Sequence, residues 1–188
     1  MRRFLSFLAI GSIFATLGEF LFCVLVRGSP SGYAFTLFAY PVLLTPAYAL
    51  SRVADRVLRA PAAADLVYDL AMGTAGLMIE WFWIGNSPWA NPSANQIGMF
   101  AFWATVFTMP RLLLAGRAEL TAWRRTIAWS FGVFSAASIL IGLLLPAGYR
   151  LFVLVWLVVV GYVGMELQIG AAIWITAQSE RLSPVFQH

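Results

Sequence analysis

The chain has 188 residues, of which 61% are hydrophobic and 11% are charged, with a formal net charge of +4. Soluble domains carry about 25% charged residues, so this composition and the mean hydropathy of +0.82 exclude an ordinary soluble domain and indicate an integral membrane protein. The lone cysteine, Cys23, excludes an intrachain disulfide, and the lone histidine, His188, excludes the common histidine-based zinc and haem sites. We therefore expect no metal and no other cofactor.

The basic residues are all arginines, and they fall between the apolar stretches. We expect them to meet lipid headgroups and to set the orientation of the chain, and we expect no nucleic-acid partner. Because the sequence contains no P-loop, we do not expect the chain to hydrolyse ATP by itself.

The apolar stretches are long enough, at about 20 residues each, to cross a bilayer. They predict an all-α, polytopic membrane helical bundle with six transmembrane helices in a single domain, residues 1–188. The expected spans are residues 4–26, 33–51, 65–84, 97–115, 126–146 and 150–178.

Three features refine these spans. The first apolar run is longer than the usual signal-peptide core of about 7–15 residues, so we interpret it as a retained span. Pro41 and Pro46 predict a kink or a partly unwound turn in the second span. The linker that follows is typical of a brief surface helix that ends at Pro61.

The distribution of arginines predicts the orientation. Arg27 and Arg150 fall on one side of the expected spans, and ten arginines fall on the other: Arg2, Arg3, Arg52, Arg56, Arg59, Arg111, Arg117, Arg124, Arg125 and Arg181. The positive-inside rule then places both termini in the cytoplasm, as expected for a multi-pass protein of a bacterial-type inner (plasma) membrane. The two halves of three spans would be inverted relative to one another, whether or not they are a true repeat.

Two acids share one face of the third span. Asp69, Gly73, Gly76, Glu80 and Trp83 are separated by 4, 3, 4 and 3 residues, which is the spacing of a single helical stripe. An ionised side chain at membrane depth costs roughly 2.5–3.5 kcal/mol on insertion scales. We therefore expect this stripe to face other helices or a wet cavity.

Depth along the helices groups the acids. Glu19 and Glu80 each lie roughly 22 Å from the cytoplasmic ends of their spans, and Glu166 comes roughly 24 Å in from the other side, nearer the middle. Two neighbouring carboxylates in a low-dielectric site cannot both ionise cheaply. Glu19 and Glu80 thus predict a shared proton or cation site, or alternatively a protonated glutamate that holds helices together.

Other polar and aromatic residues complete the predicted site. Arg111 reaches the inner level of Asp69, and we expect these two to form a structural ion pair. Asn95 is a good N-cap before the fourth span, although its loop could also dip inward with Trp89 as a lid. The candidate ligand-binding residues are Glu19, Glu80, Trp83, Trp89, Asn95, Trp103 and Glu166.

The order of several residues resembles a known family, the CmpB-type ABC-transporter permeases, which are small polytopic membrane proteins. The resemblance covers about residues 15–105, with Ala90 and Asn91 where the family has aspartate and tyrosine. It rests on Glu19, the Arg27-Gly28 loop, the tyrosines and prolines of the second span, Glu80, Trp89, Asn95, Gly98 and the Phe102-Trp103 pair. It implies a role in transport.

Three functions stay open from the sequence. The first is a transport or ligand-binding protein for a proton, a cation or a small amphipathic or lipid-like molecule. The second is a membrane-embedded acid–base enzyme of isomerase or cyclase type, which would act on a lipid or isoprenoid with Glu19, Glu80 and Glu166 as catalytic groups. The third is an accessory subunit. In each case the lipid bilayer is a partner, and the size favours a homo-oligomer or a larger membrane complex.

Overall fold

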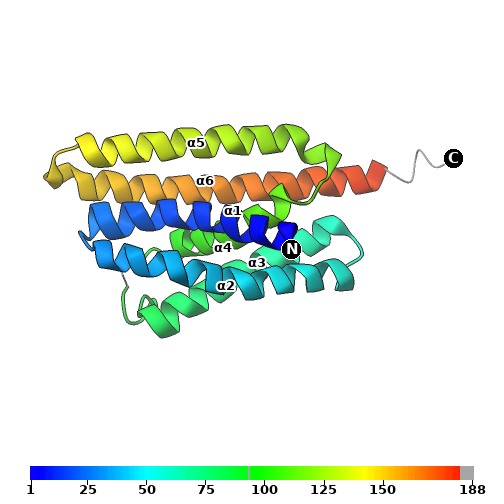
Figure 1. Ribbon diagram of the computed structural model, residues 1–188, viewed down its shortest axis with the longest axis horizontal. Helices are drawn as coiled ribbons and strands as arrows, with labels where there is room; N and C mark the ends of the chain where they lie inside the picture. Colours follow the sequence, from blue (N-terminus) through cyan, green and yellow to red (C-terminus); the bar gives the residue numbers. More distant parts are fainter. Residues whose placement is uncertain (93, 183–188) are drawn as a thin grey trace.

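The computed structural model describes residues 1–92 and 94–182, and this part of the chain is helical with no strand. Figure 1 shows the helices running back and forth along one long axis. The elements, in chain order, are α1 (Arg2–Glu19), η1 (Phe20–Val26), α2 (Pro30–Val57), α3 (Pro61–Ile79), η2 (Glu80–Ile84), α4 (Gln96–Leu113), η3 (Ala118–Leu120), α5 (Thr121–Leu144) and α6 (Ala147–Leu182).

The all-α class is confirmed, and the six α-helices of the described chain match the six expected spans in order. Five of them, α1, α2, α3, α5 and α6, are long and apolar enough to cross a membrane. The helix that does not meet this criterion is α4.

Helix α4 is the centre of the bundle. It packs against α1, α2, α3 and α6, and every residue from Trp103 to Leu112 is buried. Because protein rather than lipid covers this helix, it can carry Thr105, Thr108 and Arg111 in its interior turns.

Capping residues explain where the helices begin. Pro30 and Pro61 stand at the first turns of α2 and α3, where the missing backbone N–H is not needed. The Ser29 hydroxyl accepts from Gly32 N at 3.3 Å, and the Asn95 side chain accepts from Gly98 N at 2.8 Å. For Asn95, the structure thus shows the capping role that the sequence left open.

α2 continues as one helix through Pro41 and Pro46, so the partly unwound alternative for the second span is wrong. α2 also extends to Val57, so the expected separate surface helix in the linker is wrong, and these residues form the last turns of α2. α3 begins at Pro61, one turn before the expected span. The extension of α2 brings Asp55, which is partly exposed, within hydrogen-bonding distance of Arg111.

The N-terminus and the end of α6 lie toward the same end of the bundle (Figure 1). We call this end, where α1 and α3 begin and α2 and α4 end, the basic end, because Arg3, Arg52, Arg111 and Arg117 line one cavity there. Glu19 and Glu80 lie away from the basic end, where α1 and α3 end.

Candidate functional site: carboxyl groups inside the bundle

Glu80 is buried where α3 gives way to the π-helical segment η2. The indole nitrogen of Trp103 donates to its Oε1 at 3.0 Å, and the amide of Asn86 donates to its Oε2 at 2.7 Å. Gly76 makes this approach of α4 geometrically feasible, because a Cβ at that position would lie 2.0 Å from Trp103 Cγ. The glycine in the stripe therefore positions the indole against the carboxylate.

Glu19 has a similar setting at the end of α1, directly before the π-helical segment η1. The Tyr40 hydroxyl donates to Glu19 Oε1 at 2.5 Å, and the Cys23 thiol donates to Oε2 at 3.2 Å. Short π-helical segments occur frequently at functional sites. Both acids of the predicted pair thus stand at such a segment and have a donor on each oxygen.

The structure connects Glu19 and Glu80 through aromatic rings. The ring of Tyr40, bound to Glu19, lies 5.7 Å from the ring of Trp103, bound to Glu80. Tyr162 of α6 packs nearby, with its hydroxyl accepting from Gly18 N and donating to the carbonyl of Phe14. The two acids therefore belong to one polar–aromatic group, which we call the outer group.

Asp69 and Glu166 form a second pair, nearer the middle of the bundle. The two carboxyls lie near each other across the contact between α3 and α6, and Thr108 of α4 lies beside Asp69. Asp69 is 4% exposed and Thr108 is fully buried. Asp69 Oδ1, Thr108 Oγ1 and Glu166 Oε2 are buried without a hydrogen-bond partner among the described residues.

The expected ion pair between Arg111 and Asp69 is wrong, because Arg111 pairs with Asp65 and Asp55 instead. Arg111 Nε donates to Asp65 Oδ1 at 2.8 Å and Nη2 donates to Asp55 Oδ1 at 2.6 Å. The error has two causes: α2 extends beyond the expected span and brings Asp55 to Arg111, and Asp65, the first residue of the expected third span, lies one turn nearer the basic end than Asp69.

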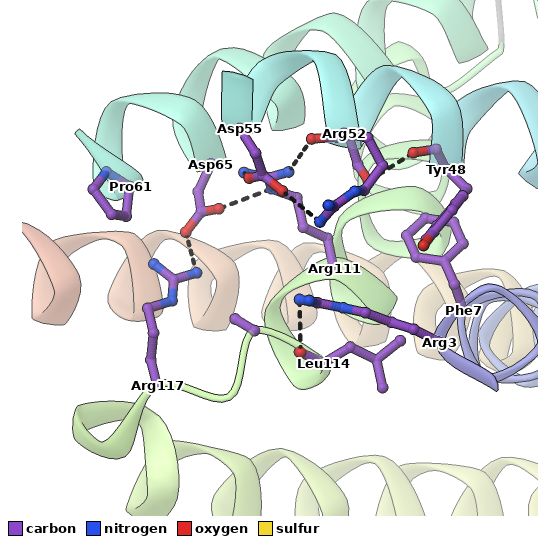
Figure 2. Close-up of a pocket in the computed structure, with 12 residues that line it drawn as sticks. Arg3, Phe7, Tyr48, Arg52, Asp55, Pro61, Asp65, Arg111, Leu114 and Arg117 are labelled. Atoms are coloured by element: carbon purple, nitrogen blue, oxygen red, sulfur yellow. Dashed lines mark hydrogen bonds and ion pairs between the residues drawn. The ribbon is translucent and has the colours of Figure 1, made fainter. Parts of the chain in front are cut away.

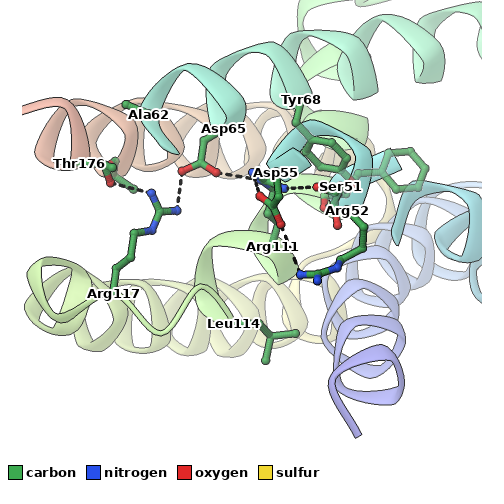
Figure 3. A network of polar contacts seen from close by, with 12 residues as sticks. Ser51, Arg52, Asp55, Ala62, Asp65, Tyr68, Arg111, Leu114, Arg117 and Thr176 are labelled. Carbon is green, nitrogen blue, oxygen red and sulfur yellow. Dashed lines mark hydrogen bonds and ion pairs between the residues drawn. The ribbon is translucent and has the colours of Figure 1, made fainter. Parts of the chain in front are cut away.

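This ion-pair network lies at the basic end (Figure 3). Arg111 also donates to Ser51 O at 2.7 Å. Arg117 donates to Asp65 Oδ2 at 2.5 Å and to the Thr176 hydroxyl at 3.0 Å. Arg111 is 8% exposed and Asp65 is 1% exposed. The network joins α2, α3 and α4 to α6.

Two predicted ligand-binding residues lie on the surface. Trp83 is 80% exposed and Trp89 is 67% exposed, with the Trp89 ring packed against Trp81 at 5.4 Å. Trp83 leaves the stripe because η2 begins at Glu80, and a π-helical turn rotates the following residues relative to an α-helix. Of the predicted tryptophans, the structure places Trp103 against Glu80.

Sequence reasoning missed several partners of these acids. Asp65 extends the stripe of α3 by one turn before Asp69, so the spacing could have indicated it. Tyr40 and Asn86 are ordinary span and loop residues in the sequence, and only the packing shows that they hold Glu19 and Glu80.

Comparisons with protein-family models, curated proteins and solved structures found no match to this chain. The resemblance to the CmpB-type permeases therefore has no support from them. The functional argument rests on the geometry of the site.

Proposed function

We propose that this protein is a membrane transport protein in which Asp69 and Glu166 hold an exchangeable proton and the outer group, Glu19 and Glu80 with their aromatic neighbours, holds the transported ligand. The observation that carries the proposal is the approach of the Asp69 and Glu166 carboxyls, neither of which forms an ion pair with an arginine among the described residues.

Electrostatics requires a positive charge at this contact. Two carboxylates about 4 Å apart repel each other by about 4 kcal/mol at an effective dielectric constant of 20. Burial adds the cost of removing each charge from water. A proton shared by the two carboxyls removes the repulsion and turns the contact into a hydrogen bond.

The neighbouring turn of α3 shows another way to neutralise a buried acid, which is not used at Asp69. Asp65 is neutralised by Arg111 and Arg117, whose charges are permanent. A proton can leave and return, whereas a guanidinium cannot. The difference between these two turns favours a transport role over a purely structural one for Asp69.

A proton fits the donor set better than a metal cation. Two carboxyls and one hydroxyl, from Asp69, Glu166 and Thr108, offer fewer oxygens than the roughly six that hard cations take. The basic end also repels cations, because its cavity is lined by four arginines and two aspartates.

The outer group is the proposed ligand site. By helical rise, Glu80 lies roughly 16 Å from Asp69 along α3. The glutamates provide charge for a cation or an amphipathic molecule, and the rings of Tyr40 and Trp103 provide flat surfaces that attract cations. A change in η1 or η2 between α and π geometry would move these carboxylates.

The orientation of the chain also belongs to this proposal. With the basic end in the cytoplasm, the positive-inside rule is satisfied and both termini are cytoplasmic in a bacterial-type inner membrane. α4 then crosses the membrane between α1, α2, α3 and α6, and a homo-oligomer or larger complex covers further apolar surface.

Proton movement in proteoliposomes tests the proposal. The purified chain is reconstituted with a pH-sensitive dye inside, and a potassium gradient with valinomycin makes the lumen negative. We expect acidification with the wild type and with the control Glu119→Gln, and none with Asp69→Asn or Glu166→Gln. No wild-type signal above that of empty liposomes would contradict the proposal.

The enzyme alternative is supported by the aromatic rings around Glu19 and Glu80, which could stabilise a carbocation. It predicts that detergent-purified protein converts an added isoprenoid without any gradient. Glu80→Gln would then abolish conversion.

A further inference from the structure

A cavity of about 240 Å³ opens at the basic end, where α1 and α3 begin and α2 and α4 end (Figure 2). This volume greatly exceeds the roughly 30 Å³ that one water molecule occupies in the liquid. Its charged lining consists of Arg3, Arg52, Arg111, Arg117, Asp55 and Asp65.

The inner wall of this cavity is electrically balanced by its own ion pairs. Asp65 accepts from Arg111 at 2.8 Å and from Arg117 at 2.5 Å, and Asp55 accepts from Arg111 at 2.6 Å. These contacts use both acids of the lining, so the excess positive charge resides on the remaining arginines.

Arg3 and Arg52 carry this excess. Arg3 Nη2 donates to the Leu114 carbonyl at 3.0 Å, and Arg3 has no ion pair among the described residues. Arg52 reaches only Asp55, at 3.5 Å, and Arg111 already binds that acid more closely. Each guanidinium has five N–H donors, so both retain donors for a ligand. Figure 2 shows them extending into one space from α1 and α2.

Two guanidiniums that converge on one cavity match the geometry of a phosphate group, which accepts paired N–H donors. The surroundings match a lipid in particular. The outer faces of α1 and α2 near the cavity expose Leu5, Leu50 and Val53, which can contact acyl chains. Basic pockets between membrane helices bind anionic headgroups.

We propose that this cavity binds a phosphate-bearing anion, either the headgroup of an anionic lipid or a free phosphate compound, through Arg3 and Arg52. This site is separate from the carboxyls of the proposed transport path. It would link the closure of the basic end to the lipid or the anion that is bound there.

The test measures thermal unfolding of the purified full chain in detergent at constant ionic strength. Short-chain phosphatidylglycerol, short-chain phosphatidylcholine and inorganic phosphate are titrated separately. We expect saturable stabilisation by phosphatidylglycerol. Its apparent affinity should be about fivefold weaker in Arg3→Gln or Arg52→Gln, because each variant loses about one basic contact to the anionic headgroup. The controls Arg2→Gln and Arg56→Gln, which change arginines outside the cavity, should bind like the wild type.

The outcomes distinguish the source of the phosphate. Stabilisation by phosphatidylglycerol alone assigns the site to a lipid headgroup, and saturable stabilisation by inorganic phosphate that competes with the lipid assigns it to a free phosphate compound. Equal stabilisation by phosphatidylcholine, no stabilisation by either anion, or equal losses in the cavity and control variants would overturn the proposal. If Arg3→Gln does not fold, Arg52→Gln alone provides the comparison with the control variants.

Discussion

Asp65 and Asp69 occupy successive turns on one face of α3, yet Asp65 accepts hydrogen bonds from two guanidiniums while Asp69 faces the carboxyl of Glu166. One helix thus carries an acid neutralised by arginines beside an acid that, in our proposal, shares a proton with Glu166. The first holds the basic end together, and the second is available for chemistry.

Removing the guanidinium of Arg111 should destabilise the protein strongly. Arg111→Leu leaves Asp65 buried with Arg117 as its remaining partner, and breaking a buried ion pair in this way costs about 3–5 kcal/mol. We expect a lower unfolding midpoint in detergent and a smaller monodisperse fraction on size-exclusion chromatography. Arg125→Leu, at an exposed position of α5, is the control and should change the midpoint little.

Adding one methyl group at Gly76 should separate Trp103 from Glu80. The new Cβ would lie 2.0 Å from Trp103 Cγ, so Gly76→Ala should cost about 1–3 kcal/mol of unfolding free energy through overpacking. Gly164→Ala is the matched control in α6, because nothing lies within 4 Å of its added Cβ. There, alanine should stabilise the helix by about 0.5–1 kcal/mol. Equal effects in the two variants would contradict the close approach of α4 to Gly76.

Removing the Tyr40 hydroxyl should weaken the outer group without changing its packing. Tyr40→Phe keeps the ring against Trp103 but leaves Glu19 Oε1 without its donor, and a hydrogen bond to a charged group contributes about 1.5–3 kcal/mol. Thermal unfolding measures this loss, with Tyr149→Phe at an exposed position as the control. An unchanged midpoint in Tyr40→Phe would argue against the Glu19 contact.

The periodicity of α3 indicated correctly that Asp69 and Glu80 face the interior, because ionisable side chains on an apolar helix are costly to expose to lipid. The partners were harder to predict. Counting helical rise gave depths along the bundle but no directions around each helix, so Glu166 was placed near the middle without its contact to Asp69.

Local backbone changes also limited the prediction. The extension of α2 to Val57 brought Asp55 to the level of Arg111, and Arg111 pairs with Asp55 and Asp65 rather than with Asp69. The π-helical segment at Glu80 turned Trp83 outward, although its spacing continued the stripe. Neither change has a signal in the pattern of apolar residues.

The most direct measurement of the central claim is the infrared spectrum of the purified protein, which resolves the carbonyl stretch of a protonated carboxyl. At neutral pH we expect one such band in the wild type that shifts in deuterium oxide. It should be lost in the double variant Asp69→Asn, Glu166→Gln and retained in the control Glu119→Gln. If the band is absent from the wild type, or if it survives in the double variant, Asp69 and Glu166 do not share a proton.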